Sequence, residues 1–200
     1  MRNRSLAARG AGLGVFLTSL GVSPALALAG QAEVAIGYNH LGPQQYYEHS
    51  YAAGAFLGVG IQPIKRLALV CEAAANSGST LDSSFDLRFR SLQAGPRVSL
   101  LSNRSRVKIH AQFLIGIGRY GWRSVSPVLL DWAYQDHLIL QPGVGVDVAI
   151  SNHFAARAGV GMSFFAFKST PCGSGCEPYT DWATQLRAHV GIVVHTAAAK

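Results

Sequence analysis

The chain alternates strictly between apolar and polar residues over segment 106–113. In this segment, RVKIHAQF, the residues from Val107 to Phe113 at odd positions are apolar, and those at even positions carry a charge or a hydrogen-bonding group. A β-strand turns successive side chains to opposite faces, so the segment has one apolar and one polar face. The same period of two recurs along most of the chain, which predicts an all-β fold.

The N-terminal region has the features of an export signal. Residues 1–10 contain Arg2, Arg4 and Arg9 without any acid, and residues 11–22 form an apolar run too short to span a bilayer. The following segment, PALALAG, offers cleavage sites after Ala27 and after Ala29. We therefore expect residues 1–29 to be a cleavable signal peptide and residues 30–200 to form one exported domain.

The charge of the exported part is only mildly basic. The whole chain carries 17 basic and 10 acidic residues, a net charge of +7; removing three arginines leaves 14 basic residues, or +4. These charges are scattered along the chain. A nucleic-acid partner is therefore not expected.

Period-two patterning and turn residues divide the exported part into eight segments. Each segment meets the length of about 9–11 residues that a tilted membrane strand needs. Their ranges are 31–41, 50–62, 64–76, 85–100, 106–120, 136–150, 154–167 and 181–195. The connections are alternately long (42–49, 77–84, 121–135 and 168–180) and short, an asymmetry typical of outer-membrane barrels. An even number of antiparallel strands can close, so we predict an eight-stranded antiparallel up-and-down transmembrane β-barrel with four external loops.

The two faces of these strands differ in chemistry. We expect an apolar set to face lipid: Val34, Ile36, Leu57, Val59, Ile61, Leu67, Leu69, Val107, Ile109, Phe113, Ile115, Ile117, Leu138, Leu140, Val144, Val146, Val148, Val160, Met162, Phe164, Leu186, Val190, Ile192 and Val194. Of the polar residues at the opposite parity, His110, Gln112, Gln141, Gln185 and His189 should point inward. We expect a lumen ion-pair network of Glu33, Glu72, Arg97, Lys108, Asp147, Arg157 and Arg187. Such side chains can fill an eight-stranded barrel, so a plugged polar lumen is expected rather than an open channel.

Two local features of the pairing can be predicted. A three-residue turn at 151–153 places Asp147 opposite Arg157, with Gly145 opposite Gly159. In segment 85–100 the apolar parity changes between Phe89 and Leu92, which predicts a β-bulge near residues 90–92.

The pattern resembles the small outer-membrane β-barrel families of the OmpA/OmpX type, especially the porin-like "outer membrane protein β-barrel domain" proteins. The likeness is carried by AGAFLGVG at 53–60 with RLALV at 66–70, by GPR at 95–97, and by PGVGVD at 142–147 before FAAR at 154–157. It implies location in the outer membrane, contact with outer-membrane lipid, insertion by the barrel-assembly machinery and a structural or interaction role. A soluble periplasmic barrel resembling a lipocalin would need the opposite faces, which the inward charges disfavour.

The histidines do not form a recognisable catalytic pattern. His110, His189 and Glu72 share the inward parity, but no serine joins them at an obvious common level. We therefore expect no enzyme activity, cofactor or metal. The alternative is a lipid-modifying enzyme or a small-ligand carrier with a pocket at the barrel mouth. The sequence identifies no ligand of the loops.

The last loop and the strand ends carry two further predictions. Cys172 and Cys176 enclose the residues GSG in an exported loop, which favours a disulfide. Aromatic residues near the outer strand ends predict an interfacial girdle. They are Tyr46, Tyr47, Tyr51, Tyr120, Trp122, Trp132, Tyr134, Tyr179 and Trp182.

Overall fold

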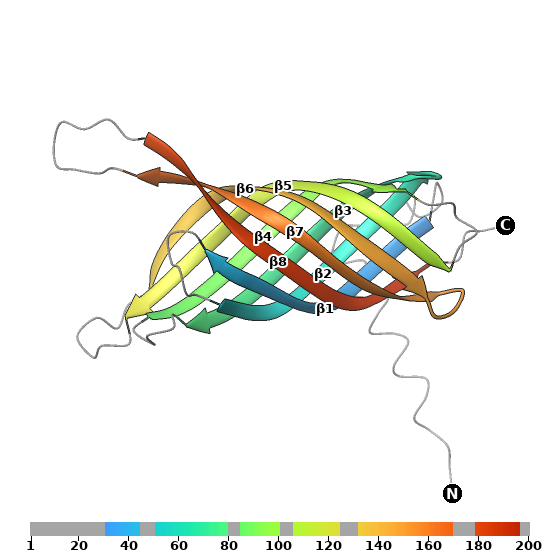
Figure 1. The fold of residues 1–200 in the computed structure, drawn as a ribbon, viewed down its shortest axis with the longest axis horizontal. Helices are drawn as coiled ribbons and strands as arrows, with labels where there is room; N and C mark the ends of the chain where they lie inside the picture. Colours follow the sequence, from blue (N-terminus) through green and yellow to red (C-terminus); the bar gives the residue numbers. More distant parts are fainter. Residues whose placement is uncertain are drawn as a thin grey trace, which may run out of the picture.

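The computed structural model is a closed barrel of antiparallel strands (Figure 1). It describes residues 31–44, 51–79, 85–100, 106–124, 132–169 and 179–196. The expected signal segment 1–29, the Cys172–Cys176 pair and most of each long connection lie outside the described residues. The described residues include no helix that is long and apolar enough to cross a membrane.

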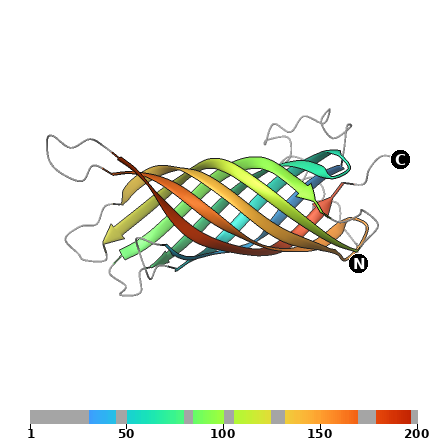
Figure 2. The same cartoon turned by 45° about the horizontal axis from the view of Figure 1, so that its top comes forward.

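The eight strands follow one another around the barrel in chain order. They are β1 (Gln31–Gln44), β2 (Tyr51–Ile64), β3 (Leu67–Ser79), β4 (Phe85–Ser99), β5 (Val107–Ser124), β6 (Ala133–Ala149), β7 (Phe154–Ser169) and β8 (Tyr179–His195). Each strand pairs with its neighbours in the sequence, and β1 also pairs with β8. Seen from a second direction, the strands are strongly tilted around the long axis (Figure 2). The predicted fold class is therefore confirmed.

Closure provides partners for the backbone groups of both terminal strands. The register between β1 and β8 is continuous from Glu33 opposite His195 to Leu41 opposite Arg187, and the Thr196 amide donates to the Ala32 carbonyl at 2.9 Å. In hydrocarbon an unpaired backbone group costs several kcal/mol, so a membrane sheet needs this closure.

The short connections lie at one end of the barrel, where β1 begins and β8 ends. β2 and β3 are joined through Lys65 and Arg66, and β6 and β7 through residues 150–153. In the second turn the Ile150 amide donates to the Phe154 carbonyl at 2.9 Å. We call this the turn end and the opposite end the loop end.

The predicted faces agree with the burial pattern. None of the apolar residues expected to face lipid is buried, whereas Gln141, Asp147, Arg157 and Arg187 are among the inward polar residues that are buried. Glu33 and Lys108, which share their parity, are half-buried near the turn end. Along each strand, the apolar residues of the alternating pattern therefore lie on the outer wall, and the polar residues point into the barrel.

The register of β6 and β7 was predicted correctly. Asp147 lies opposite Arg157, and Gly145 lies opposite Gly159. The turn fixes this register because pairing continues directly from Ala149 opposite Ala155.

The bulge predicted in β4 is wrong. The pairing of β4 with both neighbours continues without a shift through Arg90 and Leu92. Strict alternation instead places Leu87 and Phe89 inside the barrel, with exposures of 4% each, while Leu92 faces outward. The apolar residues change from odd to even positions because Leu87 and Phe89 pack inside the barrel, and the strand contains no extra residue.

Several strands extend further toward the loop end than the polarity pattern indicates. β5 continues to Ser124 and β6 begins at Ala133. A charged pair joins the extension of β5 to the start of β4, because the Arg123 Nη2 atom lies 2.6 Å from Asp86 Oδ2. Since polar groups occupy this stretch of the outer face, apolar alternation ends before the backbone pairing does.

Candidate functional site

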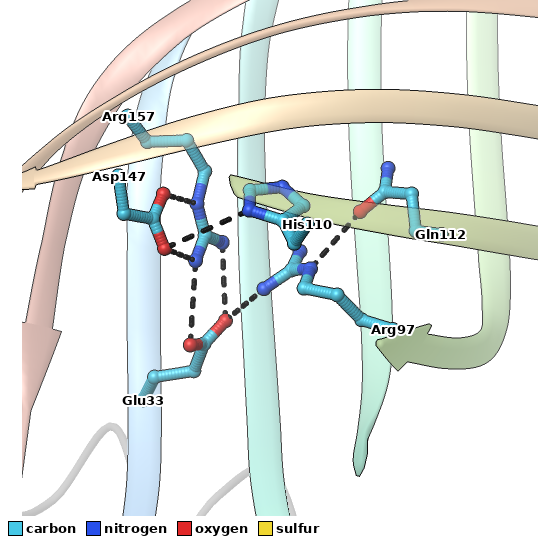
Figure 3. Close-up of polar contacts among 6 residues, drawn as sticks. All are labelled: Glu33, Arg97, His110, Gln112, Asp147 and Arg157. Atoms are coloured by element: carbon cyan, nitrogen blue, oxygen red, sulfur yellow. Dashed lines mark hydrogen bonds and ion pairs between the residues drawn. The ribbon is translucent and has the colours of Figure 1, made fainter. Parts of the chain in front are cut away.

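A cluster of four ionised side chains occupies the interior near the turn end. Arg157 donates from Nε to Asp147 Oδ1 at 2.7 Å and from Nη2 to Asp147 Oδ2 at 2.8 Å (Figure 3). The same guanidinium reaches Glu33, with Nη1 and Oε1 separated by 3.0 Å. Arg97 also contacts Glu33. Two arginines and two carboxylates thus balance in charge, the condition under which buried ions are tolerated.

Polar neighbours orient the members of this cluster. Arg97 donates from Nε to Gln112 Oε1 at 3.1 Å, and His110 Nδ1 lies 3.9 Å from Asp147 Oδ2 (Figure 3). Gly145 leaves the space that His110 needs, since a Cβ atom there would lie 2.6 Å from His110 Nε2. The six side chains of Figure 3 come from β1, β4, β5, β6 and β7, so the cluster ties together most of the wall.

A second polar cluster surrounds Arg187, which is 2% exposed. Arg187 donates from Nε to Asn39 Oδ1 at 3.0 Å and from Nη1 to Gln141 Oε1 at 3.2 Å, and Nη1 lies 2.5 Å from Glu72 Oε1. Gln141 Oε1 accepts further hydrogen bonds from Gln93 Nε2 and Ser163 Oγ. Arg187 is therefore held by groups from three other strands.

Six of the seven residues expected to form one ion-pair network lie in two separate clusters. Glu33, Arg97, Asp147 and Arg157 meet in the first cluster, and Glu72 and Arg187 meet in the second. Lys108 lies opposite Asp147 in the register of β5 and β6, but it forms no ion pair with any residue that the structure describes.

Sequence reasoning identified Gln112 and Gln141 as inward residues but missed three other buried amides near these clusters. Asn39, Asn76 and Gln93 have exposures of 0%, 5% and 3%, and Asn39 Nδ2 donates to Asn76 Oδ1 at 2.8 Å. All of them have the inward parity of their strands, which is the signal that could have identified them.

An apolar layer, defined by Leu41, Ala52, Phe89, Tyr120, Ile139 and Phe165, lies inside the barrel toward the loop end. The ring centroid of Phe89 is 5.0 Å from that of Tyr120 and 5.6 Å from that of Phe165. The Tyr120 hydroxyl donates to Gln185 Oε1 at 3.1 Å. Tyr120 is therefore an interior residue and not part of an outer girdle, whereas Tyr134 and Trp182 are 54% and 43% exposed on the outer face.

The polar side chains of the interior clusters bind one another, as expected for a structural role. Ser163 Oγ donates to Gln141 Oε1 at 3.2 Å, and His137 Nδ1 lies 3.2 Å from the Ala166 carbonyl oxygen. Among these same residues, no group of three or more His, Cys, Asp and Glu side chains could hold a metal ion. Every ionised side chain of the first cluster contacts an opposite charge, which suits stabilisation of the wall.

No protein-family model matches the sequence, and no curated protein matches it. In structure, the chain is similar to Neisserial surface protein A, with a TM-score of 0.60 and 12% identity over 82% of this chain and 95% of that one. It is also similar to the outer membrane protein OprG from Pseudomonas aeruginosa, with a TM-score of 0.56 and 12% identity over 85% and 97% of the two chains. A third match is the attachment invasion locus protein Ail of Yersinia pestis, with a TM-score of 0.54 and 14% identity over 84% and 99%.

These likenesses establish the fold. The chain has the fold of the small outer-membrane β-barrels, with a mainly apolar outer wall around a polar and partly apolar interior.

Proposed function

We propose that the protein is an integral outer-membrane protein whose barrel has a plugged lumen and serves as an anchor for four external loops. The apolar outer wall supports the membrane location. Ile36, Ile117 and Val190 are 60%, 65% and 54% exposed there, and an apolar band of this kind is the surface that barrel strands present to lipid. The resulting role is structural or interactive, with the four loops presented outside the membrane.

The observation that carries the proposal is the packing of the interior. Phe165, Ile139 and Leu41 are 0% exposed in the apolar layer, and Arg157 and Arg187 are 3% and 2% exposed in the polar clusters. An eight-stranded barrel has an interior only about wide enough for side chains. The polar clusters and the buried apolar side chains together leave little room for a continuous aqueous path.

A conductance measurement tests the plugged lumen. Purified protein inserted into planar lipid bilayers should give no stable ion channels. The double variant Phe89→Ala, Phe165→Ala, which removes two rings of the apolar layer, should conduct more than the parent protein. Steady ohmic channels from the parent protein would contradict a plugged lumen.

The orientation follows from the lengths of the connections, because outer-membrane barrels keep short turns in the periplasm and long loops outside. An epitope inserted between residues 80 and 84 should bind antibody on intact cells. The matched control is the same epitope inserted at residues 151–153, which should bind antibody only after the outer membrane is permeabilised. The reverse pattern would contradict this orientation.

We also propose that residues 1–29 are removed on export, that the barrel-assembly machinery inserts the protein, and that Cys172 and Cys176 form a disulfide. The mass of the purified protein tests the first and third of these points. Cleavage after Ala29 would give a chain beginning at Gly30, and alkylation without reductant should modify Cys71 only. Intact Met1 or three alkylated cysteines would contradict them.

A further inference from the structure

The outward-facing arginines are gathered in one sector of the barrel. Among the strand residues whose side chains are described, arginines point outward only on β4 and β5. We call this sector the arginine patch, and it consists of Arg88, Arg90, Arg119 and Arg123 together with Asp86 and Asp136. Four arginines against two aspartates leave an excess of two positive charges.

The arginine patch borders directly on the apolar wall at the loop end. Leu92, Ile117 and Leu138 form one cross-strand row and are 53%, 65% and 45% exposed. The next row toward the loop end contains Arg90, Arg119 and Asp136 on the same three strands. Since two residues along a strand span about 7 Å, the arginines lie at the level where acyl chains give way to headgroups.

Aromatic rings hold part of the arginine patch in place. The Arg88 Cζ atom lies 4.1 Å and the Arg123 Cζ atom 5.2 Å from the ring centroid of Trp132. Trp132 is stacked on Tyr134 with centroids 6.2 Å apart. These contacts draw two guanidinium groups together, although their charges repel each other.

The charges within the arginine patch are incompletely balanced. Arg119 makes two short contacts with Asp136, at 2.6 and 2.8 Å, and Arg123 pairs with Asp86. Arg90 lies directly opposite Arg119, and it forms no ion pair with any of the described residues. Like charges directly opposite each other on a sheet are destabilising, so an anion at this position would relieve the repulsion.

We propose that the arginine patch binds the phosphate groups of a phosphorylated lipid in the outer leaflet. The acyl chains of this lipid would lie along the row of Leu92, Ile117 and Leu138, and its phosphates would accept hydrogen bonds from Arg88 and Arg90. The placement in the outer leaflet rests on the proposed orientation. Binding itself does not depend on orientation and is measured separately from it.

Lipid binding is tested by native mass spectrometry of the protein released from nanodiscs. The nanodiscs contain phosphatidylcholine with lipid A that carries both phosphates, or with dephosphorylated lipid A. The parent protein should retain the phosphorylated form preferentially. Because each basic residue near an anionic surface contributes about 1 kcal/mol, Arg88→Gln, Arg90→Gln should weaken retention roughly 10- to 30-fold.

The matched control is Arg66→Gln, Arg106→Gln, which removes two exposed arginines from the turn end. This control should retain lipid A like the parent protein. The single variant Arg90→Gln tests the same point without touching the contacts of Trp132 and should weaken retention several-fold. Inorganic phosphate should not displace the lipid, because it cannot use the apolar row.

Three results would overturn the proposal: equal retention by the two double variants, equal retention of dephosphorylated lipid A by the parent protein, or displacement by inorganic phosphate. Each variant is first shown to be folded by its mobility before and after boiling. Loss of lipid preference in a correctly oriented barrel would leave the proposed anchoring role intact, so the two proposals fail separately.

Discussion

Arg157 and Asp147 face each other on neighbouring strands inside the barrel and are joined by two hydrogen bonds, of 2.7 and 2.8 Å. Their side chains are only 2% and 9% exposed. The pair is also linked through Arg157 to Glu33, which lies 124 residues away in the sequence. The short turn therefore fixes the pairing of Asp147 with Arg157, and closure of the barrel brings Glu33 of the first strand to the same pair.

Removing Arg157 should destabilise the barrel strongly. Arg157→Met leaves Asp147 without its guanidinium partner in the interior, and breaking a buried pair in this way typically costs about 3–5 kcal/mol. Urea unfolding in lipid vesicles, followed by electrophoretic mobility, measures this change in free energy. The control is Arg119→Met at an exposed pair, where a loss within about 1 kcal/mol is expected. Equal losses in the two variants would contradict a stabilising role for the interior pair.

Loss of a ring from the apolar layer should also be costly. Phe165 is fully buried, with its ring 5.6 Å from Phe89 and 5.9 Å from Tyr120. Phe165→Ala should lower the free energy of unfolding by about 3–5 kcal/mol. Phe113→Ala, which removes a ring that is 44% exposed on the outer wall, should cost clearly less in the same urea titration. A larger loss at Phe113 would place the main apolar packing outside the barrel.

Two glycines on neighbouring strands should respond differently to substitution. A Cβ atom on Gly37 would overlap the Val190 carbonyl oxygen and lie 2.7 Å from Phe56 Cε1, whereas one on Gly58 would have its nearest neighbour, Ala35 Cβ, at 3.7 Å. Gly37→Ala should therefore destabilise the barrel by about 1–3 kcal/mol. Gly58→Ala should be neutral or stabilising by up to about 1 kcal/mol. The midpoints of thermal unfolding compare the two, and the reverse order would contradict the close approach of β1 and β8.

The tryptophans provide a test of which face meets lipid. Trp182 is 43% exposed on the outer wall, whereas Trp122 lies opposite the buried Leu87 and shares its inward face. Lipids brominated near the headgroup end of their acyl chains should quench a variant retaining only Trp182 more than one retaining only Trp122. Stronger quenching of Trp122 would mean that the assigned faces are reversed.

Much of the barrel follows from local rules that the sequence displays directly. Alternation along β5 separates Ile109 and Phe113 on the outer wall from His110 and Gln112 inside, and the turn before Phe154 sets the pairing of Asp147 with Arg157. These relations involve residues close together in the chain, so strand geometry alone determines them.

The interior apolar layer could not be predicted in the same way. Phe89 and Phe165 have the inward parity, but an apolar side chain is stable both against lipid and inside a protein. The polarity pattern therefore suggested a bulge in β4 where the chain continues straight. Alternation also does not specify the height along the barrel at which side chains of distant strands lie. It therefore could not predict that Arg157 pairs with Glu33 whereas Arg187 pairs with Glu72.

The most direct test is electrophoresis of unboiled and boiled protein extracted from outer-membrane fractions. A closed barrel held by complete strand pairing and buried ion pairs should stay folded in detergent and migrate differently before and after boiling. We expect recovery in the outer-membrane fraction with two distinct mobilities. Recovery in the soluble periplasm, or one identical mobility, would contradict a membrane-anchored closed barrel.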